Sequence, residues 1–237
     1  MVIVESVTLE AKQTAYHACL KSCPGPLKCK KNGLIFVENL FFPCPDFQHH
    51  KKAKAIQKEL DQSIPESLKD AQIKDYQCGN ETQQRLLAVA NRYFMKKAWE
   101  KGMGMIITGT PGLGKTFMAV AMYKQLMQKG IQAAFARPKT QGSYQSIEKY
   151  YKQLEQPKVL IYDDMGPELR KEIIVDMLFF LFDRRMSANK GVIITTNLPI
   201  NNLKYSLGPR IHSRLKEKNY FLEIKGEDYR QRKRDLY

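Results

Sequence analysis

A glycine-rich segment, Gly109 to Thr116 with the sequence GTPGLGKT, has the residue types needed to hold the phosphates of a nucleotide. It matches the pattern G-x-x-x-x-G-K-[ST], in which backbone amides of the loop and of the following helix donate hydrogen bonds to phosphate oxygens. In this pattern Lys115 reaches the β- and γ-phosphates, and the Thr116 hydroxyl binds Mg²⁺. We therefore expect ATP or ADP to bind here together with Mg²⁺. The residues expected to line the nucleotide are Gly109, Thr110, Pro111, Gly112, Leu113, Gly114, Lys115 and Thr116.

Two adjacent carboxylates follow a second apolar run, in the sequence KVLIYDDMG. Asp163 is expected to hold Mg²⁺ through water, and Asp164 to orient or deprotonate the attacking water. A fixed acid beside Mg²⁺ and a γ-phosphate favours hydrolysis by water over transfer to another acceptor. Glu168 is a further candidate to assist that acid. The alternative for Glu168 is a first-turn acid that interacts with the dipole of its own helix.

An asparagine and two arginines extend this set of candidate residues. Asn197 ends the run ITTN, where it could hydrogen bond the γ-phosphate or the water, or cap a turn. Arg210 and Arg214, in LGPRIHSRL, are four residues apart and share one face of a helix. An arginine supplied to a neighbouring subunit's nucleotide stabilises charge on the transferred phosphoryl group. A solvated basic face is the alternative for this pair.

Alternating apolar and amphipathic segments must position these residues. Short apolar runs predict strands at 104–109, 131–136, 158–164, 191–197 and 220–224. Helical spacing of apolar residues predicts helices at 81–102, 115–130, 143–156, 168–191 and 211–219. This alternation predicts an α/β fold with a central parallel sheet that is covered on both faces.

The first part of the chain has a different composition. Four of its five cysteines lie within the first 44 residues, beside Pro and Gly, and such clustering in a cytosolic chain argues for metal over disulfides. Zinc takes four N or S ligands, which Cys19, Cys23, Cys29 and Cys44 can supply. Their spacing departs from paired C-x₂-C motifs, so the fourth ligand stays open, and unligated core cysteines are the alternative. The candidates for that ligand are His17, Cys29, His49 and His50.

The pattern changes near residue 80. We therefore expect a small cysteine-rich N-terminal domain at 1–80 and a nucleotide-binding domain at 81–237. The net charge is +15, of which +13 falls on residues 81–237, with 28 basic against 15 acidic side chains. A polyanionic partner such as nucleic acid would explain this excess, and solubility alone is the alternative. No apolar run reaches the roughly 18 residues of a membrane span, and no secretory signal is evident, so we expect a cytoplasmic protein without a membrane partner.

From Glu81 onward the chain resembles the AAA+ ATPases, and among them the DnaC and DnaI helicase loaders and the related IstB transposition ATPases. The resemblance rests on GTPGLGKT, LIYDDMGPE, ITTNLP and LGPRIHSRL, in this order. It implies an AAA+ P-loop fold, here without a C-terminal helical lid, because the chain stops soon after the last expected strand. Most AAA+ members have Glu where this chain has Asp164. The resemblance also implies sensor 1 at Asn197 and an arginine finger at Arg214, with Arg210 beside it. Arg230 approximates a terminal arginine of the loaders.

The resemblance implies a loader function as well. The segments KSCPGPLKC and FFPCP are similar to the zinc-binding N-terminal domain with which DnaI-type loaders contact the replicative helicase. We therefore expect an ATP-dependent loader of a hexameric DNA helicase onto single-stranded DNA, in a bacterium, a phage or a mobile element. We also expect copies of the chain to associate through their ATP sites.

Two other functions are considered beside the loader. The first is an IstB-like transposition ATPase that binds target DNA. The second is a P-loop kinase of a small molecule, which Asn197, the arginine pair and the basic charge disfavour. Candidate DNA contacts are Arg137, Lys139 and Tyr144 in one loop, and the tail YRQRKR.

Overall fold

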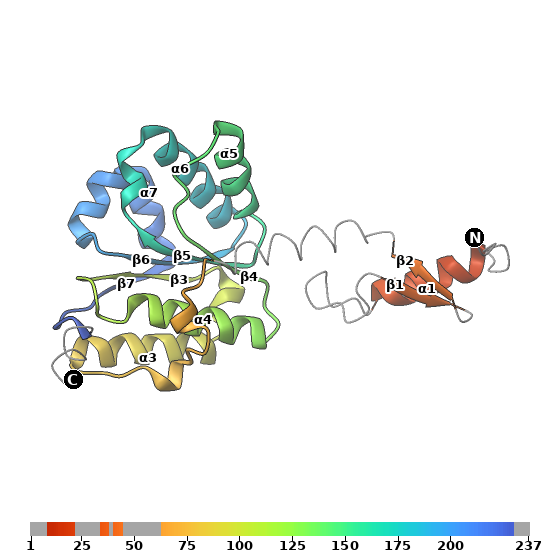
Figure 1. Ribbon diagram of the computed structural model, residues 1–237, viewed down its shortest axis with the longest axis horizontal. Coiled ribbons are helices and arrows are strands. Elements are labelled where there is room, and N and C mark those ends of the chain that lie inside the picture. Colours follow the sequence, from red (N-terminus) through yellow and green to blue (C-terminus); the bar gives the residue numbers. More distant parts are fainter. Residues whose placement is uncertain (1–8, 22–33, 38–39, 45–62, 230–237) are drawn as a thin grey trace. The chain divides into compact units, whose positions relative to one another are not determined.

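Five parallel strands form the sheet that carries the phosphate loop and the two carboxylates (Figure 1). Their order across the sheet is β4-β5-β6-β3-β7, so the strand that leads into the phosphate loop, β3, lies between β6 and β7. Nearly every residue of β3, β4, β5 and β6 is buried, because helices cover both faces, whereas the edge strand β7 is only partly buried. The strands are β3 (Gly104–Thr108), β4 (Ala133–Ala136), β5 (Val159–Met165), β6 (Gly191–Thr196) and β7 (Asn219–Glu223).

The helices are divided between the two faces of this sheet. In Figure 1, α3 (Glu81–Met95) and α4 (Lys115–Gln128) lie on one face. The opposite face carries α5 (Tyr144–Gln153), α6 (Glu172–Ser187) and α7 (Ile200–Lys218). Short 3₁₀ helices complete the unit: η2 (Glu66–Leu68), η3 (Ile73–Asp75), η4 (Ala98–Lys101) and η5 (Pro167–Arg170). The expected α/β fold with a central parallel sheet is therefore confirmed.

Two helices differ from the prediction at their ends. α3 ends at Met95 instead of near residue 102, because Lys97 adopts a left-handed conformation with φ of 46° and breaks the helix before η4. α7 begins at Ile200 and includes residues on both sides of a kink at Gly208, where φ is 77°. The Gly208-Pro209 pair is typical of a helix boundary, so sequence reasoning found only the second half of this helix.

The computed structural model describes residues 9–21, 34–37, 40–44 and 63–229. The chain divides into two compact units, 1–59 and 60–237, which are described here one at a time. Residues 63–80 belong to the larger unit: Ala71, Ile73 and Tyr76 are buried in its hydrophobic core. The larger unit therefore begins about twenty residues before the expected boundary at residue 80. Among the described helices, none is long and apolar enough to cross a membrane.

The described residues of the smaller unit form one helix and one pair of strands. α1 (Leu9–Lys21) contacts β1 (Leu34–Val37), which pairs antiparallel with β2 (Leu40–Pro43). Cys19 lies on α1, and Cys44 is buried directly after β2. Cys23 and Cys29 lie outside the described residues, as do His49 and His50. Within the described ranges no three potential ligands come together, so the zinc site stays a prediction.

Candidate functional site

The phosphate loop follows β3 directly and ends at the first turn of α4. Gly109, Gly112 and Gly114 adopt φ values of 145°, 79° and 79°, which side-chain-bearing residues rarely reach. The ammonium of Lys115 donates hydrogen bonds to the carbonyl oxygens of Gly109 and Thr110, both at 2.7 Å. The lysine therefore lies inside a loop whose amides, together with the N-terminus of α4, favour bound anions.

Two segments that are distant in sequence support this loop. The Tyr76 hydroxyl donates to the Leu113 carbonyl oxygen at 3.2 Å, and burial raises the pKa of that hydroxyl above its ordinary value. The Tyr229 amide donates to the Gly112 carbonyl oxygen at 3.1 Å, and the Asp228 carboxylate lies directly against Gly112. Sequence reasoning missed these contacts, because single residues in irregular segments carry no periodic signal.

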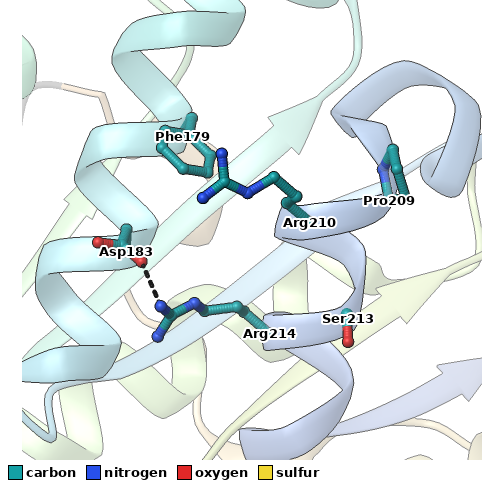
Figure 2. A pocket seen from close by; sticks show the side chains of 6 residues that line it. All are labelled: Phe179, Asp183, Pro209, Arg210, Ser213 and Arg214. Atoms are coloured by element: carbon teal, nitrogen blue, oxygen red, sulfur yellow. Dashed lines mark ion pairs between the residues drawn. The ribbon is translucent and has the colours of Figure 1, made fainter.

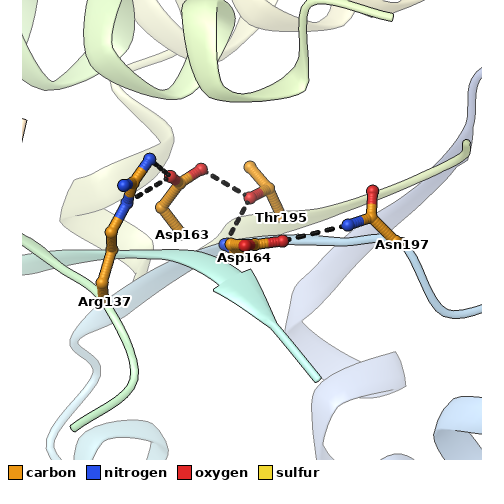
Figure 3. Close-up of polar contacts among 5 residues, drawn as sticks. All are labelled: Arg137, Asp163, Asp164, Thr195 and Asn197. Carbon is orange, nitrogen blue, oxygen red and sulfur yellow. Dashed lines mark hydrogen bonds and ion pairs between the residues drawn. The ribbon is translucent and has the colours of Figure 1, made fainter. Parts of the chain in front are cut away.

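Asp163 is the last of five consecutive buried residues in β5, and both of its carboxylate oxygens accept hydrogen bonds (Figure 3). Oδ1 accepts a hydrogen bond from the Thr195 hydroxyl at 2.7 Å. Oδ2 accepts from Nε and Nη2 of Arg137, at 3.1 and 3.0 Å. The DNA contact considered for Arg137 stays a prediction, and in the structure the guanidinium lies on this carboxylate. Because β4 neighbours β5, the residue that follows β4 reaches the end of β5, which only the strand order reveals.

Asp164 lies beside Asn197 at the ends of two neighbouring strands (Figure 3). The Asn197 side-chain amide donates to Asp164 Oδ1 at 3.0 Å, and the Asp164 backbone amide donates to the Thr195 hydroxyl at 2.9 Å. Asp164 has φ of 60°, at the point where the register between β5 and β6 shifts. Aspartate is among the residue types that tolerate this conformation, and such outliers concentrate at functional sites.

Glu168 is fully buried and lies in the first turn of the 3₁₀ helix η5, as the first-turn alternative for this residue expects. Its Oε2 accepts a hydrogen bond from the Gly166 amide at 2.8 Å. Burial raises the pKa of this carboxyl above its ordinary value, and the Gly166 amide partly opposes that shift. Glu168 thus closes the turn that follows the two aspartates.

Arg210 and Arg214 lie on α7, and their side chains point toward α6 (Figure 2). Arg214 forms an ion pair with Asp183 at 3.1 Å, and the Arg210 guanidinium lies 5.4 Å from the centroid of the Phe179 ring. The contacts described for both arginines go to α6, and none of these joins them to the phosphate loop or to the aspartates. They line a cavity of about 370 Å³ with Phe179, Asp183, Pro209 and Ser213.

The residues at this sheet edge suit a magnesium nucleotide. The Asp163 carboxylate and the Thr116 hydroxyl are oxygen ligands of the type that Mg²⁺ prefers. The phosphate loop offers backbone amides and the Lys115 ammonium, which are the donors that phosphate oxygens accept. The donor chemistry of the site therefore agrees with the nucleotide and metal expected from the sequence.

Comparison with known proteins identifies the family. A family model described as IstB-like ATP binding protein matches residues 49–236. The chain belongs to this family. As a DnaC/IstB-like AAA+ protein it is an ATPase, and its five-stranded parallel sheet agrees with the fold of its structural neighbours.

Relatives of the chain include a helicase loader and an ATP-binding protein of an insertion sequence. The chain is 27% identical to the uncharacterized protein YdaV of Escherichia coli K12 over 73% of each chain. It is 25% identical to the replicative helicase loader DnaC of Buchnera aphidicola (subsp. Schizaphis graminum), over 76% of this chain and 78% of that one. It is 29% identical to the insertion sequence IS21 putative ATP-binding protein of Pseudomonas aeruginosa, over 55% and 54%. A crystal structure of the DnaC helicase loader superposes with a TM-score of 0.58 and 26% identity, covering 68% of this chain and 100% of that one.

Proposed function

We propose that this IstB-like protein is an ATP-dependent loader of a hexameric replicative DNA helicase onto single-stranded DNA during replication initiation. One observation carries the proposal: the similarity to the DnaC helicase loader spans the whole of that solved chain, at 26% identity. The similarity to the Buchnera DnaC loader, over 78% of its length, supports the same function. The protein would act in the cytoplasm of a bacterium, where a chromosome, a phage or a mobile element is replicated.

In this proposal the loop Gly109–Thr116 binds the phosphates of ATP, and Asp163 and Thr116 hold Mg²⁺. Mg²⁺, when bound, neutralises charge on the phosphates. Asp164 orients or deprotonates the attacking water, and its side chain is held by the Asn197 amide at 3.0 Å. Asn197 is therefore suited to act beside Asp164 as the sensor-1 residue.

Self-association would complete the site. The Arg214 side chain is 52% exposed and Arg210 is exposed too, so both could reach a neighbouring copy from the α6–α7 surface. In our proposal Arg214 acts on the nucleotide of that neighbour, with Arg210 beside it. ATP hydrolysis would then depend on the association of copies of the chain, so that hydrolysis could time a step of helicase loading.

We assign helicase docking to the N-terminal residues, which include the unit 1–59. Zinc would be held by Cys19, Cys23, Cys29 and Cys44, or by a set in which a histidine replaces one cysteine. Single-stranded DNA would be bound by the basic larger unit. The exposed Tyr144 and the basic tail are the candidate contacts.

A second function is favoured by the family model and by the relative from IS21, which suggest a transposition ATPase. The two functions predict different partners. Tagged full-length protein, with ATP present, should retain the host's replicative helicase, and a variant that lacks residues 1–59 should not. Retention of a transposase from the same element, without the helicase, would overturn the loader in favour of the second function. Transfer of phosphate from ATP to a nucleoside would instead support the kinase considered from the sequence.

A further inference from the structure

Arg137 makes a contact that none of the sequence motifs accounts for. Its guanidinium donates two hydrogen bonds to one oxygen of Asp163, at 3.1 and 3.0 Å (Figure 3). The Asp163 side chain is fully buried, whereas 42% of the Arg137 side chain is exposed. The cation therefore reaches a buried carboxylate from the solvent side of the site.

A buried carboxylate needs a compensating charge, because taking it out of water is costly. The Thr195 hydroxyl satisfies one oxygen of Asp163 but brings no charge. Arg137 supplies the positive charge at the other oxygen. Mg²⁺ would bring two positive charges to the same carboxylate, so the guanidinium and the metal compete for it.

The backbone around Arg137 is held independently of this ion pair. The Tyr150 hydroxyl donates to the Arg137 carbonyl oxygen at 2.7 Å, and the Tyr151 hydroxyl donates to the Lys139 carbonyl oxygen at 3.4 Å. The Lys171 ammonium donates to the Thr140 carbonyl oxygen at 2.7 Å. The guanidinium can therefore leave Asp163 by side-chain rotation while the segment stays in place.

We propose that Arg137 is a positioning residue that holds the Asp163 carboxylate before Mg²⁺ binds and yields it to the metal when Mg²⁺ arrives with the nucleotide. In the metal-free protein, Arg137 offsets the negative charge of Asp163, which would otherwise repel the phosphates of ATP. The inference rests on the proposed role of Asp163 toward Mg²⁺, and it does not depend on helicase loading.

The test compares ATP binding by the full-length protein in Mg²⁺ and in EDTA, using titration calorimetry. The quantity of interest is the ratio of the two dissociation constants, EDTA over Mg²⁺. Arg137→Gln should raise this ratio about tenfold, because only metal-free binding loses the compensating charge. Arg137→Lys keeps the charge and should stay near the wild-type ratio. An unchanged ratio in folded Arg137→Gln would overturn the proposal.

Lys171→Gln is the matched control, since it removes one positive charge and one contact from the same segment without touching Asp163. Its ratio should equal that of the wild type, and a tenfold rise here would show that general charge loss explains the effect. Asp163→Asn distinguishes the proposed role of Asp163 toward Mg²⁺ from the proposed role of Arg137. If it leaves the Mg²⁺ dependence of ATP binding intact, the role of Asp163 fails. If it abolishes that dependence while Arg137→Gln changes nothing, only the role of Arg137 fails.

A measurement on the wild-type protein follows the guanidinium itself and needs a variant only to assign its resonance. The ¹⁵Nε resonance of Arg137, assigned by its loss in Arg137→Lys, should shift when ADP is added with Mg²⁺. It should shift much less with ADP in EDTA, because the guanidinium then stays on Asp163. Equal shifts in both conditions would contradict the exchange of arginine for metal.

Discussion

At the scale of single residues, Lys115 and Glu168 show how burial and local contacts shape the site. Lys115 is buried within the phosphate loop and bonded to two of the loop's own carbonyl oxygens. Glu168 is buried behind the two aspartates, with the Gly166 amide as its partner. The first residue is expected to bind nucleotide, and the second stabilises the turn that holds the aspartates in place.

Lys115→Ala should weaken ATP binding at least about 100-fold, because the ammonium that faces the phosphates is lost together with two hydrogen bonds of the loop. Titration calorimetry with ATP and Mg²⁺ measures this. Lys124→Ala is the control, since Lys124 lies on the same helix and its ammonium is 3.9 Å from Asp70 on the surface. Undiminished ATP binding by Lys115→Ala would remove the assignment of the phosphate loop.

Glu168→Gln should become more stable relative to the wild type as the pH rises. Burial raises the pKa of this carboxyl, so the folded protein binds its proton more tightly than the unfolded chain does. The stability that the group contributes is complete below the unfolded pKa and is lost as the pH rises through the folded value. Glutamine mimics the neutral form at every pH. Urea unfolding of both proteins, at pH values from below the unfolded pKa to above the folded pKa of Glu168, measures the difference in their free energies of unfolding. A difference that stays constant with pH would contradict the raised pKa.

At the scale of elements, the parallel register gathers the polar residues that end β4, β5 and β6. Arg137, Asp163, Thr195, Asp164 and Asn197 form one hydrogen-bonded series across these strand ends (Figure 3). The phosphate loop comes from β3, beside β6. The order of strands therefore explains why residues far apart in sequence serve one site.

Two glycines with similar backbones should respond differently to alanine. Gly112 and Gly208 have φ of 79° and 77°, so each Ala variant is strained by about 1 kcal/mol. A Cβ on Gly112 would also lie 1.8 Å from the Asp228 carboxylate, whereas a Cβ on Gly208 meets nothing within 4 Å. Gly112→Ala should therefore weaken ATP binding more than tenfold, and Gly208→Ala should only lower the free energy of unfolding. Equal ATP affinities in calorimetry would contradict this account of the loop.

The sequence predicted the helices and strands more accurately than it predicted the contacts between side chains. Continuously apolar runs such as MIIT and VIITT are typical of buried parallel strands, so β3 and β6 were found close to their observed bounds. The phosphate loop follows β3 directly and the two aspartates lie near the end of β5, which made both recognisable. Arg137 and Thr195 were missed as partners of Asp163, because their role depends on which strands are neighbours. The first half of α7 was missed because Gly208 and Pro209 interrupt it.

At the scale of the whole molecule, the basic charge and the two arginines suggest assembly on an anionic partner. The segment 81–237 carries a net charge of +13, and Arg210 and Arg214 lie on the α6–α7 surface. Their described contacts are to α6 and not to the phosphate loop, which supports the proposal that they act on a second copy of the chain.

Arg214→Ala should lower the rate of ATP hydrolysis by about 10³-fold under conditions where copies associate, while ATP affinity of the monomer stays unchanged. Steady-state hydrolysis and calorimetry, each at several protein concentrations, separate the two effects. Arg184→Ala is the control, because Arg184 is an exposed arginine on α6 that pairs with Glu155 at 2.8 Å. Loss of both binding and hydrolysis in Arg214→Ala would point to a role within its own subunit.

The most direct test of the loader function is the transfer of a helicase onto DNA that has no free end. The host's hexameric helicase is incubated with circular single-stranded DNA, ATP and the full-length protein, and the helicase retained on the DNA is measured. The proposal predicts strong retention with the wild-type protein and little retention with Lys115→Ala. Equal retention with and without the wild-type protein would contradict the proposed function.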